Sequence, residues 1–426
     1  MIDTIRNAWK ITDLRKKIIY TIIMIIIFRL GSCIPVPLLD PGAMQEIFTA
    51  ENSIFGFIDI ISGGAFQNAT IFAMSITPYI NSSIIMQLLT VAIPALERLS
   101  KQGEDGRKKI AQITRYGTVV LALIQAVGLY FMLQSYGAVT NPGFFTGVAV
   151  VFTFTAGTAF LMWLGEQITE KGVGNGISLI IFAGIVSRLP SMVQSLYAYA
   201  RGGTIGLVGV IVLLALIIVV IGLVVMMNEA ERRIPVQYAK RVVGRKMYGG
   251  QSTHIPIKVI AGGVIPIIFA MSIMSFPGTI ASFFGVTAES GGFWGGFLRI
   301  FSPTSVVYAI LYFLLIIFFT YFYSAIQFNP IEMSNNMKKN GGFIPGIRPG
   351  RPTSEYISKI LSRITLVGAI FLGLIAVLPI LMNLVLGMSN FAIGGTSLLI
   401  VVSVALETVK DIESQMLMRH YKGFLE

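Results

Sequence analysis

The chain has 426 residues and a formal net charge of +12, with 54% hydrophobic and 12% charged residues. Soluble domains carry about 25% charged residues, so the composition excludes an ordinary soluble protein and indicates one that lies in a membrane. A single cysteine excludes an internal disulfide, and two histidines are too few for a histidine-based metal or general-base cluster, so no metal or other cofactor is expected.

Positive charge alternates along the chain with long apolar segments. Of the 32 Lys and Arg residues, 28 lie in six short segments, roughly 1–17, 97–116, 166–176, 229–258, 329–363 and 407–426. The exceptions are Arg29, Arg188, Arg201 and Arg299. Because cytoplasmic loops retain Lys and Arg, the alternation predicts ten spans with both termini in the cytoplasm. Topology then explains most of the net charge without a nucleic-acid partner.

Ten apolar segments are long enough to cross a membrane, which takes about 20 residues for about 30 Å of hydrocarbon. We place them at 18–36, 71–96, 113–135, 147–168, 177–197, 205–228, 259–284, 303–328, 362–386 and 392–412. Lipid offers no partner to open backbone groups, so these spans are expected to be helices. The first is too long for a signal peptide, and no cleavage site follows it.

One apolar segment, 54–66, is too short to cross the membrane and ends in Gly63-Gly64, a natural hinge. Apolar runs of about 10–14 residues are typical of re-entrant or interfacial segments. From its residues alone, a half-helix lying at the membrane surface is an equally good interpretation.

Two spans carry isoleucines at helical spacing. They are Ile76, Ile80 and Ile84 in the second span and Ile177, Ile181 and Ile185 in the fifth. Such stripes usually face lipid or a packed core, and the alternative is a hydrophobic constriction that gates a pore. In the second span, Asn81, Ser82 and Gln87 lie off the stripe, where each could form a hydrogen bond with a neighbouring helix.

Ionisable residues are nearly absent from the middle of the second to tenth spans. Glu166, Glu407 and Asp411 lie at cytoplasmic ends, and Arg29 in the first span can extend outward to the surface. An ion-coupled transporter needs a charged site near the midplane. The chain also lacks an HExxH motif, paired aspartates in spans and a serine–histidine arrangement, which argues against an enzyme.

The run Gly172-Val173-Gly174-Asn175-Gly176 contains a GxGxG pattern. No strand precedes it, so a dinucleotide site lacks its required context. The pattern instead favours a tight turn into the fifth helix.

A short echo links the two halves of the chain, because residues 71–76 (IFAMSI) recur as residues 268–273. The second helix then corresponds to the seventh, so each half has five helices. Because five is an odd number, the halves 1–204 and 205–426 cross the membrane in opposite orientations. Inverted repeats place the working site at their interface. A secondary transporter of small solutes built from inverted repeats is therefore the alternative function.

Two cytoplasmic loops, 229–258 and 329–361, are longer than topology requires and rich in Lys and Arg. We expect the second to project without regular structure, because it is rich in glycine and proline. Basic projecting loops suit ribosomal RNA phosphates or an acidic groove on a motor protein.

Several long motifs resemble those of the SecY family of bacterial protein-conducting channels, in order along the whole chain. They are Met74–Leu89 (MSITPYINSSIIMQLL), Met162–Ile181 (MWLGEQITEKGVGNGISLII), Tyr248–Lys258 (YGGQSTHIPIK), Gly346–Gly350 (GIRPG) and Gly394–Ile400 (GGTSLLI). The resemblance implies an all-α membrane protein whose ten helices form an hourglass channel from two inverted five-helix halves. Unfolded polypeptides would cross through it, and hydrophobic segments would leave sideways into lipid.

The resemblance also implies roles for individual residues. The pore ring would be Ile76, Ile80, Ile177, Ile181, Ile268 and Ile400, and the plug, segment 54–66, would include Phe57, Ile58, Ile60, Ile61, Gly63 and Gly64. The lateral gate would contain Asn81, Gln87 and Phe276, and partners would dock on Arg245, Lys246, Lys338, Lys339 and Arg348. One departure is Ser75, where the family favours glycine beside the ring.

The implied partners are the SecE and SecG subunits, the motor ATPase SecA, the ribosome, the preproteins with their signal sequences, and the lipid bilayer. The implied location is the bacterial cytoplasmic membrane.

Overall fold

A helix overlaps each of the ten expected spans. The computed structural model describes residues 2–40, 42, 63–191, 193–194, 197, 207–238, 241–243, 246–248, 252–260, 262–283, 293–301, 305–386 and 395–422. In chain order the ten helices are α2 (Thr12–Gly31), α5 (Thr77–Ala92), α7 (Glu104–Ser135), α8 (Phe144–Lys171), α9 (Gly176–Ser187), α11 (Leu207–Glu229), α12 (Ile265–Phe283), α14 (Val306–Gln327), α16 (Arg351–Leu386) and α17 (Gly395–Lys422).

Some helix boundaries differ from the expected spans. Within the described residues, five helices are long and apolar enough to cross a membrane, and α5 with α6 (Pro94–Ser100) could form a sixth span bent by 105°. The continuous span expected over 71–96 is wrong, because turns precede Thr77 and the helix breaks before Pro94. Proline forces the preceding residue into extended backbone, and Ile93 has φ −107° and ψ 113°.

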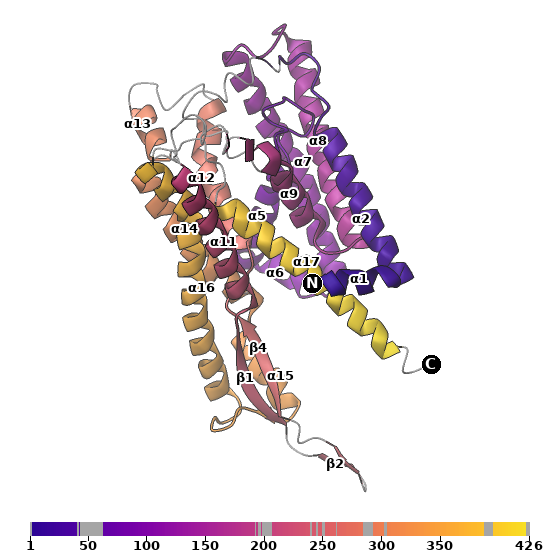
Figure 1. The fold of residues 1–426 in the computed structure, drawn as a ribbon. Coiled ribbons are helices and arrows are strands. Elements are labelled where there is room, and N and C mark those ends of the chain that lie inside the picture. Colours follow the sequence, from indigo (N-terminus) through magenta and orange to yellow (C-terminus); the bar gives the residue numbers. More distant parts are fainter. Residues whose placement is uncertain are drawn as a thin grey trace.

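The helices gather into two groups with α17 between them (Figure 1). Helices α2, α7, α8 and α9 lie on one side, and α11, α12, α14 and α16 lie on the other. Helix α17 contacts α9, α11 and α16, while α12 contacts α5 and α7. The largest cluster of buried hydrophobic side chains includes residues from both groups. The seam between the groups is therefore closed by packed side chains.

The two long basic loops, 229–258 and 329–361, form one unit with regular structure, which corrects the expectation for 329–361. Strands β1 (Glu231–Tyr238) and β4 (Ser252–Lys258) form an antiparallel hairpin. The other loop contributes α15 (Pro330–Lys339) and β5 (Gly342–Phe343), and β5 pairs with the end of β1.

Apolar side chains from both loops hold this unit together. Ile234 and Val236 of β1 share a buried cluster with Met337 of α15, Ile344 after β5 and Ile357 of α16. Proline and glycine in 329–361 therefore mark the ends of short elements and do not prevent them. Strands β2 (Arg241–Val243) and β3 (Lys246–Tyr248) extend beyond the unit (Figure 1).

The remaining helices lie at the two ends of the molecule. Helix α1 (Ile2–Lys10) contacts α17 near the end that carries the strands, whereas α13 (Phe293–Ile300) lies at the opposite end (Figure 1). The segments α1, β1, α15 and the end of α17 each carry at least two Lys or Arg residues.

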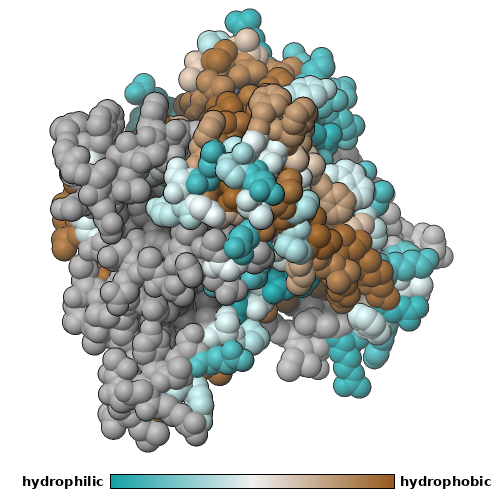
Figure 2. Space-filling view, turned by 90° about the horizontal axis from the view of Figure 1, so that it is seen from above, coloured by the Kyte–Doolittle hydropathy of each residue, from teal (hydrophilic) through white to brown (hydrophobic). Residues whose placement is uncertain are grey.

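The outer surface of the helices is apolar. Ile22, Ile23 and Ile26 of α2 and Ile218 and Val219 of α11 are exposed. Seen from the end opposite the strands, hydrophobic residues form broad areas of the described surface (Figure 2). Exposed apolar areas of this extent mark contact with a membrane or with other proteins.

Candidate functional site

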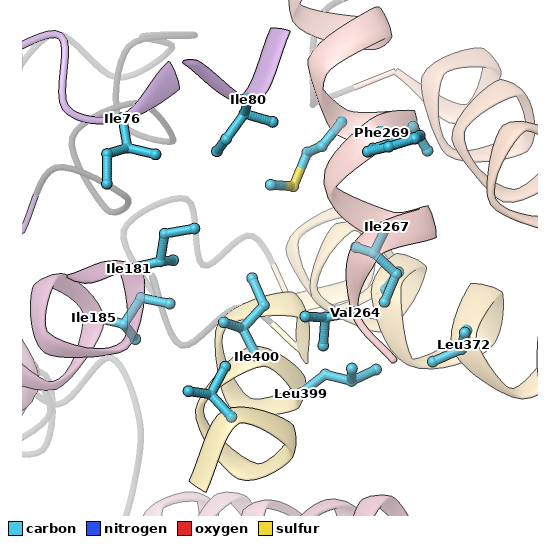
Figure 3. Packing of buried hydrophobic residues seen from close by; sticks show 14 of the residues in the cluster. Ile76, Ile80, Ile181, Ile185, Val264, Ile267, Phe269, Leu372, Leu399 and Ile400 are labelled. Carbon is cyan, nitrogen blue, oxygen red and sulfur yellow. The ribbon is translucent and has the colours of Figure 1, made fainter. Parts of the chain in front are cut away.

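Six isoleucines that the sequence analysis grouped as a ring meet in the large central cluster. Ile76, Ile80, Ile181 and Ile400 are buried within it, and Ile177 and Ile268 are partly buried and pack against it. They come from α5 and the turn before it, α9, α12 and α17, and therefore from both halves of the chain. Ile80, Ile181 and Ile400 extend from three different helices toward a common centre (Figure 3).

The third members of both isoleucine stripes, Ile84 and Ile185, are buried in the same cluster. The stripes therefore face the interior between the two halves and do not face lipid. Ile85, which follows Ile84, is exposed, and Phe182, which follows Ile181, is partly buried.

A left-handed residue positions the first isoleucine of the ring. Ser75 has φ +50° and is buried, and its N–H donates to the carbonyl of Phe72 at 2.8 Å. Left-handed backbone costs about 1–2 kcal/mol for a residue with a Cβ. A glycine would adopt this conformation without that cost. Ile76 then begins the helix, and Pro78 occupies its first turn, where the missing N–H of proline is no loss.

The end of the predicted plug segment is bound to α9 and α2. Phe57, Ile58, Ile60 and Ile61 lie outside the described residues, whereas Gly63 and Gly64 lie within them. The Gly63 carbonyl accepts a hydrogen bond from Nη1 of Arg29 at 3.0 Å and a long one from Oγ of Ser187 at 3.5 Å. Arg29 therefore forms a hydrogen bond with another part of the chain, which the sequence did not indicate.

Glycine is required at position 63. Gly63 has φ +67°, and a Cβ built on it would lie 2.8 Å from Cα of Gly184 in α9. Both facts exclude a side chain. The residues that follow turn inward, because Ala65 and Phe66 are buried.

The predicted gate residues lie along the seam but do not bond across it in the described part of the chain. Among the described residues, Gln87 contacts only Ser83 on its own helix, at a long 3.5 Å, and the Asn81 side chain forms no hydrogen bond. Phe276 on α12 is 55% exposed. Ser82, which the sequence analysis also noted, donates to the carbonyl of Thr114 in α7 at 2.9 Å. Ser82 thus attaches α5 to α7, which belongs to the same half of the chain.

The predicted docking residues that the structure describes lie on the unit formed by the two long basic loops. Arg245 is outside the described residues, and Lys246 begins β3. Lys338 and Lys339 are exposed at the end of α15, and Arg348 is exposed in the turn before α16.

Two hydrogen bonds fix the turn that carries Arg348. Oγ of Ser334 donates to the carbonyl of Gly350 at 2.7 Å, and Oγ1 of Thr353 donates to the carbonyl of Arg348 at 2.8 Å. An exposed guanidinium therefore extends from a backbone held on both sides.

Among the described residues, no charged side chain is buried. The buried polar side chains there are serines and threonines, together with the tyrosines Tyr130 and Tyr312. Glu166 pairs with Arg115 at 2.6 Å between α8 and α7, near the C-terminal end of α8. Groups of His, Cys, Asp and Glu able to hold a metal are absent from the described part. The surroundings of the isoleucines are therefore uncharged and apolar.

Comparison with known proteins agrees with this geometry. The family model described as SecY matches residues 70–409. The chain belongs to the SecY family. Proteins named protein translocase subunit SecY from Halalkalibacterium halodurans and Streptomyces scabiei are 48% and 47% identical to it, each over the full length of both chains. The one from Bacillus licheniformis is 46% identical, also over both full lengths.

Solved structures show the same fold. One described as "The structure of a protein conducting channel" has a TM-score of 0.68 at 20% identity, covering 94% of this chain and 92% of the other. Sec61 in the canine ribosome–channel complex has a TM-score of 0.65 at 19% identity, with the same coverage. The likeness of fold thus extends over nearly the whole chain.

Proposed function

We propose that this SecY-family chain is the protein-conducting channel of a bacterial cytoplasmic membrane. It passes unfolded secretory polypeptides across the membrane and releases hydrophobic segments sideways into lipid. The observation that carries this proposal is the convergence of six isoleucines from both halves in one uncharged cluster at the seam. Residues 1–204 and 205–426 form the two halves, and both termini lie in the cytoplasm.

An aliphatic ring suits a channel that accepts many sequences. A passing chain meets no fixed charge and no hydrogen-bond partner among these side chains, so no sequence is held strongly. Branched side chains can pack around an extended chain and exclude water, and a hydrophobic constriction without water blocks ions. The segment 54–66 acts as the plug on the outer side of this ring.

Sideways release follows from partition into lipid. An apolar residue such as Leu gains about 0.3–0.6 kcal/mol on the insertion scale, whereas a central charge costs about 2.5–3.5 kcal/mol. The contacts of α12 with α5 and α7 form the lateral gate, which contains Asn81, Gln87 and Phe276. Because no hydrogen bond crosses the gate at Asn81 or Gln87 in the described part, apolar packing holds it closed.

The cytoplasmic unit is the docking surface. Exposed Lys338, Lys339 and Arg348 extend from it, and Arg245 and Lys246 belong to the other basic loop. The solved relatives include channels described in complex with ribosomes. We assign the unit to ribosomal RNA and the motor SecA, and the subunits SecE and SecG to the apolar outer surface.

Reconstitution tests this function. The chain is purified with its SecE and SecG subunits, placed in lipid vesicles and supplied with SecA, ATP and an unfolded precursor. We expect protease-protected precursor inside the vesicles, and none when ATP is left out. Uptake of a labelled small solute without precursor passage would instead favour the secondary transporter, which the lack of charge in the described interior opposes.

A further inference from the structure

The glycine turn before α9 joins four helices through its backbone N–H groups. The N–H of Val173 donates to Oγ1 of Thr21 in α2 at 3.1 Å, and that of Gly176 donates to Oγ1 of Thr169 in α8 at 2.9 Å. The N–H of Gly174 donates to Oδ2 of Asp411 in α17 at 3.0 Å. Thr21 and Thr169 belong to the same half of the chain as the turn, whereas Asp411 belongs to the other half.

The backbone of the turn can only be built with glycine. Gly174 has φ +75°, and a Cβ on it would lie 3.3 Å from Oγ1 of Thr408 in α17. A Cβ on Gly176 would collide with the carbonyl oxygen of Gly165. Asn175 completes the turn by accepting from the N–H groups of Ile177 and Ser178, at 3.1 and 3.2 Å.

Neighbouring groups hold the Asp411 carboxylate in place. Nε2 of Gln415 donates to Oδ2 of Asp411 at 3.0 Å, and Nζ of Lys17 in α2 donates to Oε1 of Gln415 at 3.0 Å. Beside them, Val173 and Ile412 are buried in one apolar cluster. The carboxylate is thus supported from its own helix and, through Gln415, from α2.

The bond lies at the cytoplasmic ends of two helices that both carry ring residues. Ile177 follows Gly176 directly, and Ile181 lies one turn further along α9. On α17, Ile400 precedes Asp411 by 11 residues, or about 16 Å at the rise of an α-helix. The position of Asp411 against Gly174 therefore fixes the spacing between Ile181 and Ile400.

We propose that Asp411 is a positioning residue: its bond to Gly174 latches α17 to the glycine turn and keeps the isoleucine ring at its resting width. The proposal rests on the channel function above. Widening the ring by moving α17 from α9 breaks this charge-assisted bond, and an aliphatic ring has no directional bond of its own to replace it.

The test is the resting ion conductance of the channel complex, with its partner subunits, in planar bilayers without precursor. We expect Asp411→Ala to raise the resting open probability about tenfold, which corresponds to about 1.4 kcal/mol. Asp411→Asn should stay within about twofold of the unchanged chain, because its amide oxygen still accepts the N–H. The matched control is Glu407→Ala, one turn earlier on α17, where an exposed carboxylate makes no hydrogen bond in the described part.

Equal conductance of Asp411→Ala and Glu407→Ala overturns the latch, and so does an Asn variant that conducts like the Ala variant. A lower melting temperature of Asp411→Ala at unchanged conductance also overturns it, since it indicates a purely structural role. If Asp411→Ala does not assemble, Gln415→Leu removes only the support and should raise the open probability about threefold; no rise there refutes the latch. Precursor transport by the unchanged complex, measured in parallel, separates failure of the latch from failure of the channel function.

Discussion

Arg29 is the charged residue that most clearly departs from the topology, and its bond to Gly63 leads to a quantitative prediction. Arg29→Leu removes the Nη1 donor at 3.0 Å and leaves the Gly63 carbonyl with the 3.5 Å contact from Ser187. Hydrogen bonds of charged groups contribute about 1.5–3 kcal/mol. Because Arg29 is exposed, we take the lower end, and about 1.4 kcal/mol is a tenfold change in an equilibrium constant.

Global stability is the wrong measurement for this change. Arg29 lies in the last turn of α2, where its side chain can reach the surface, so replacing it with Leu leaves the helix intact and slightly more apolar while it weakens the local attachment. The melting temperature is therefore expected to stay constant or to rise. The effect must be measured at the residues that the bond holds.

Hydrogen exchange of the segment after Gly63 provides that measurement. The N–H of Asn68 donates to the carbonyl of Gly64 at 3.3 Å, and that of Thr70 donates to the carbonyl of Ala65 at 3.0 Å. Local opening governs their exchange, so Arg29→Leu should speed it about tenfold. Arg29→Lys keeps a donor, so its exchange rates should lie between those of the unchanged chain and those of Arg29→Leu. Ile26→Leu, an exposed apolar change on the same helix, is the control. Exchange rates in Arg29→Leu that match those of the control refute the reasoning.

Three further predictions concern the ring, the docking surface and the strained residue. Ile80→Ser combined with Ile181→Ser should increase ion conductance in planar bilayers while a precursor crosses, because hydroxyls retain water in the constriction; unchanged conductance counts against the ring. Arg348→Glu should block SecA-driven export into vesicles, whereas Lys359→Glu, the same charge change on α16, should not, and normal export by the first variant contradicts its docking role. Ser75→Gly should raise the unfolding free energy by at most about 1.5 kcal/mol, since relief of left-handed strain, about 1–2 kcal/mol, is partly offset by the chain entropy of glycine, about 0.5–1 kcal/mol. Thermal unfolding in detergent measures it, and a fall would mean that the side chain of Ser75 makes a stabilising contact.

The sequence predicted the features that depend on local pattern or on long motifs. A described helix overlaps each of the ten segments placed by hydrophobic length, and the tight turn at 172–176 is confirmed by Gly174 at φ +75° and the start of α9 at Gly176. The departure at Ser75 marked a position that the structure shows to be left-handed. These features are decided within a few residues, where composition is informative.

Features that depend on distant pairing were missed. Asp411 and Gly174 are 237 residues apart in the chain, and neither the turn motif nor the helix pattern indicates the other partner. The pairing of β5 with β1 was missed for the same reason, and with it the regular structure of 329–361. The break in the second span was not predicted, because Pro94 lies near the end of a continuous apolar segment.

The two kinds of contact at the seam have different consequences for opening. Apolar contacts between Ile80, Ile181 and Ile400 are not directional, and an entering polypeptide replaces them with contacts of its own. Opening the ring around a passing chain therefore loses little of this packing. The bond between Asp411 and Gly174 is directional, and an extended chain in the ring offers no hydrogen bond to replace it at that end of α9 and α17. We therefore expect the isoleucines to set how tightly the channel seals and Asp411 to set how seldom it opens without a precursor.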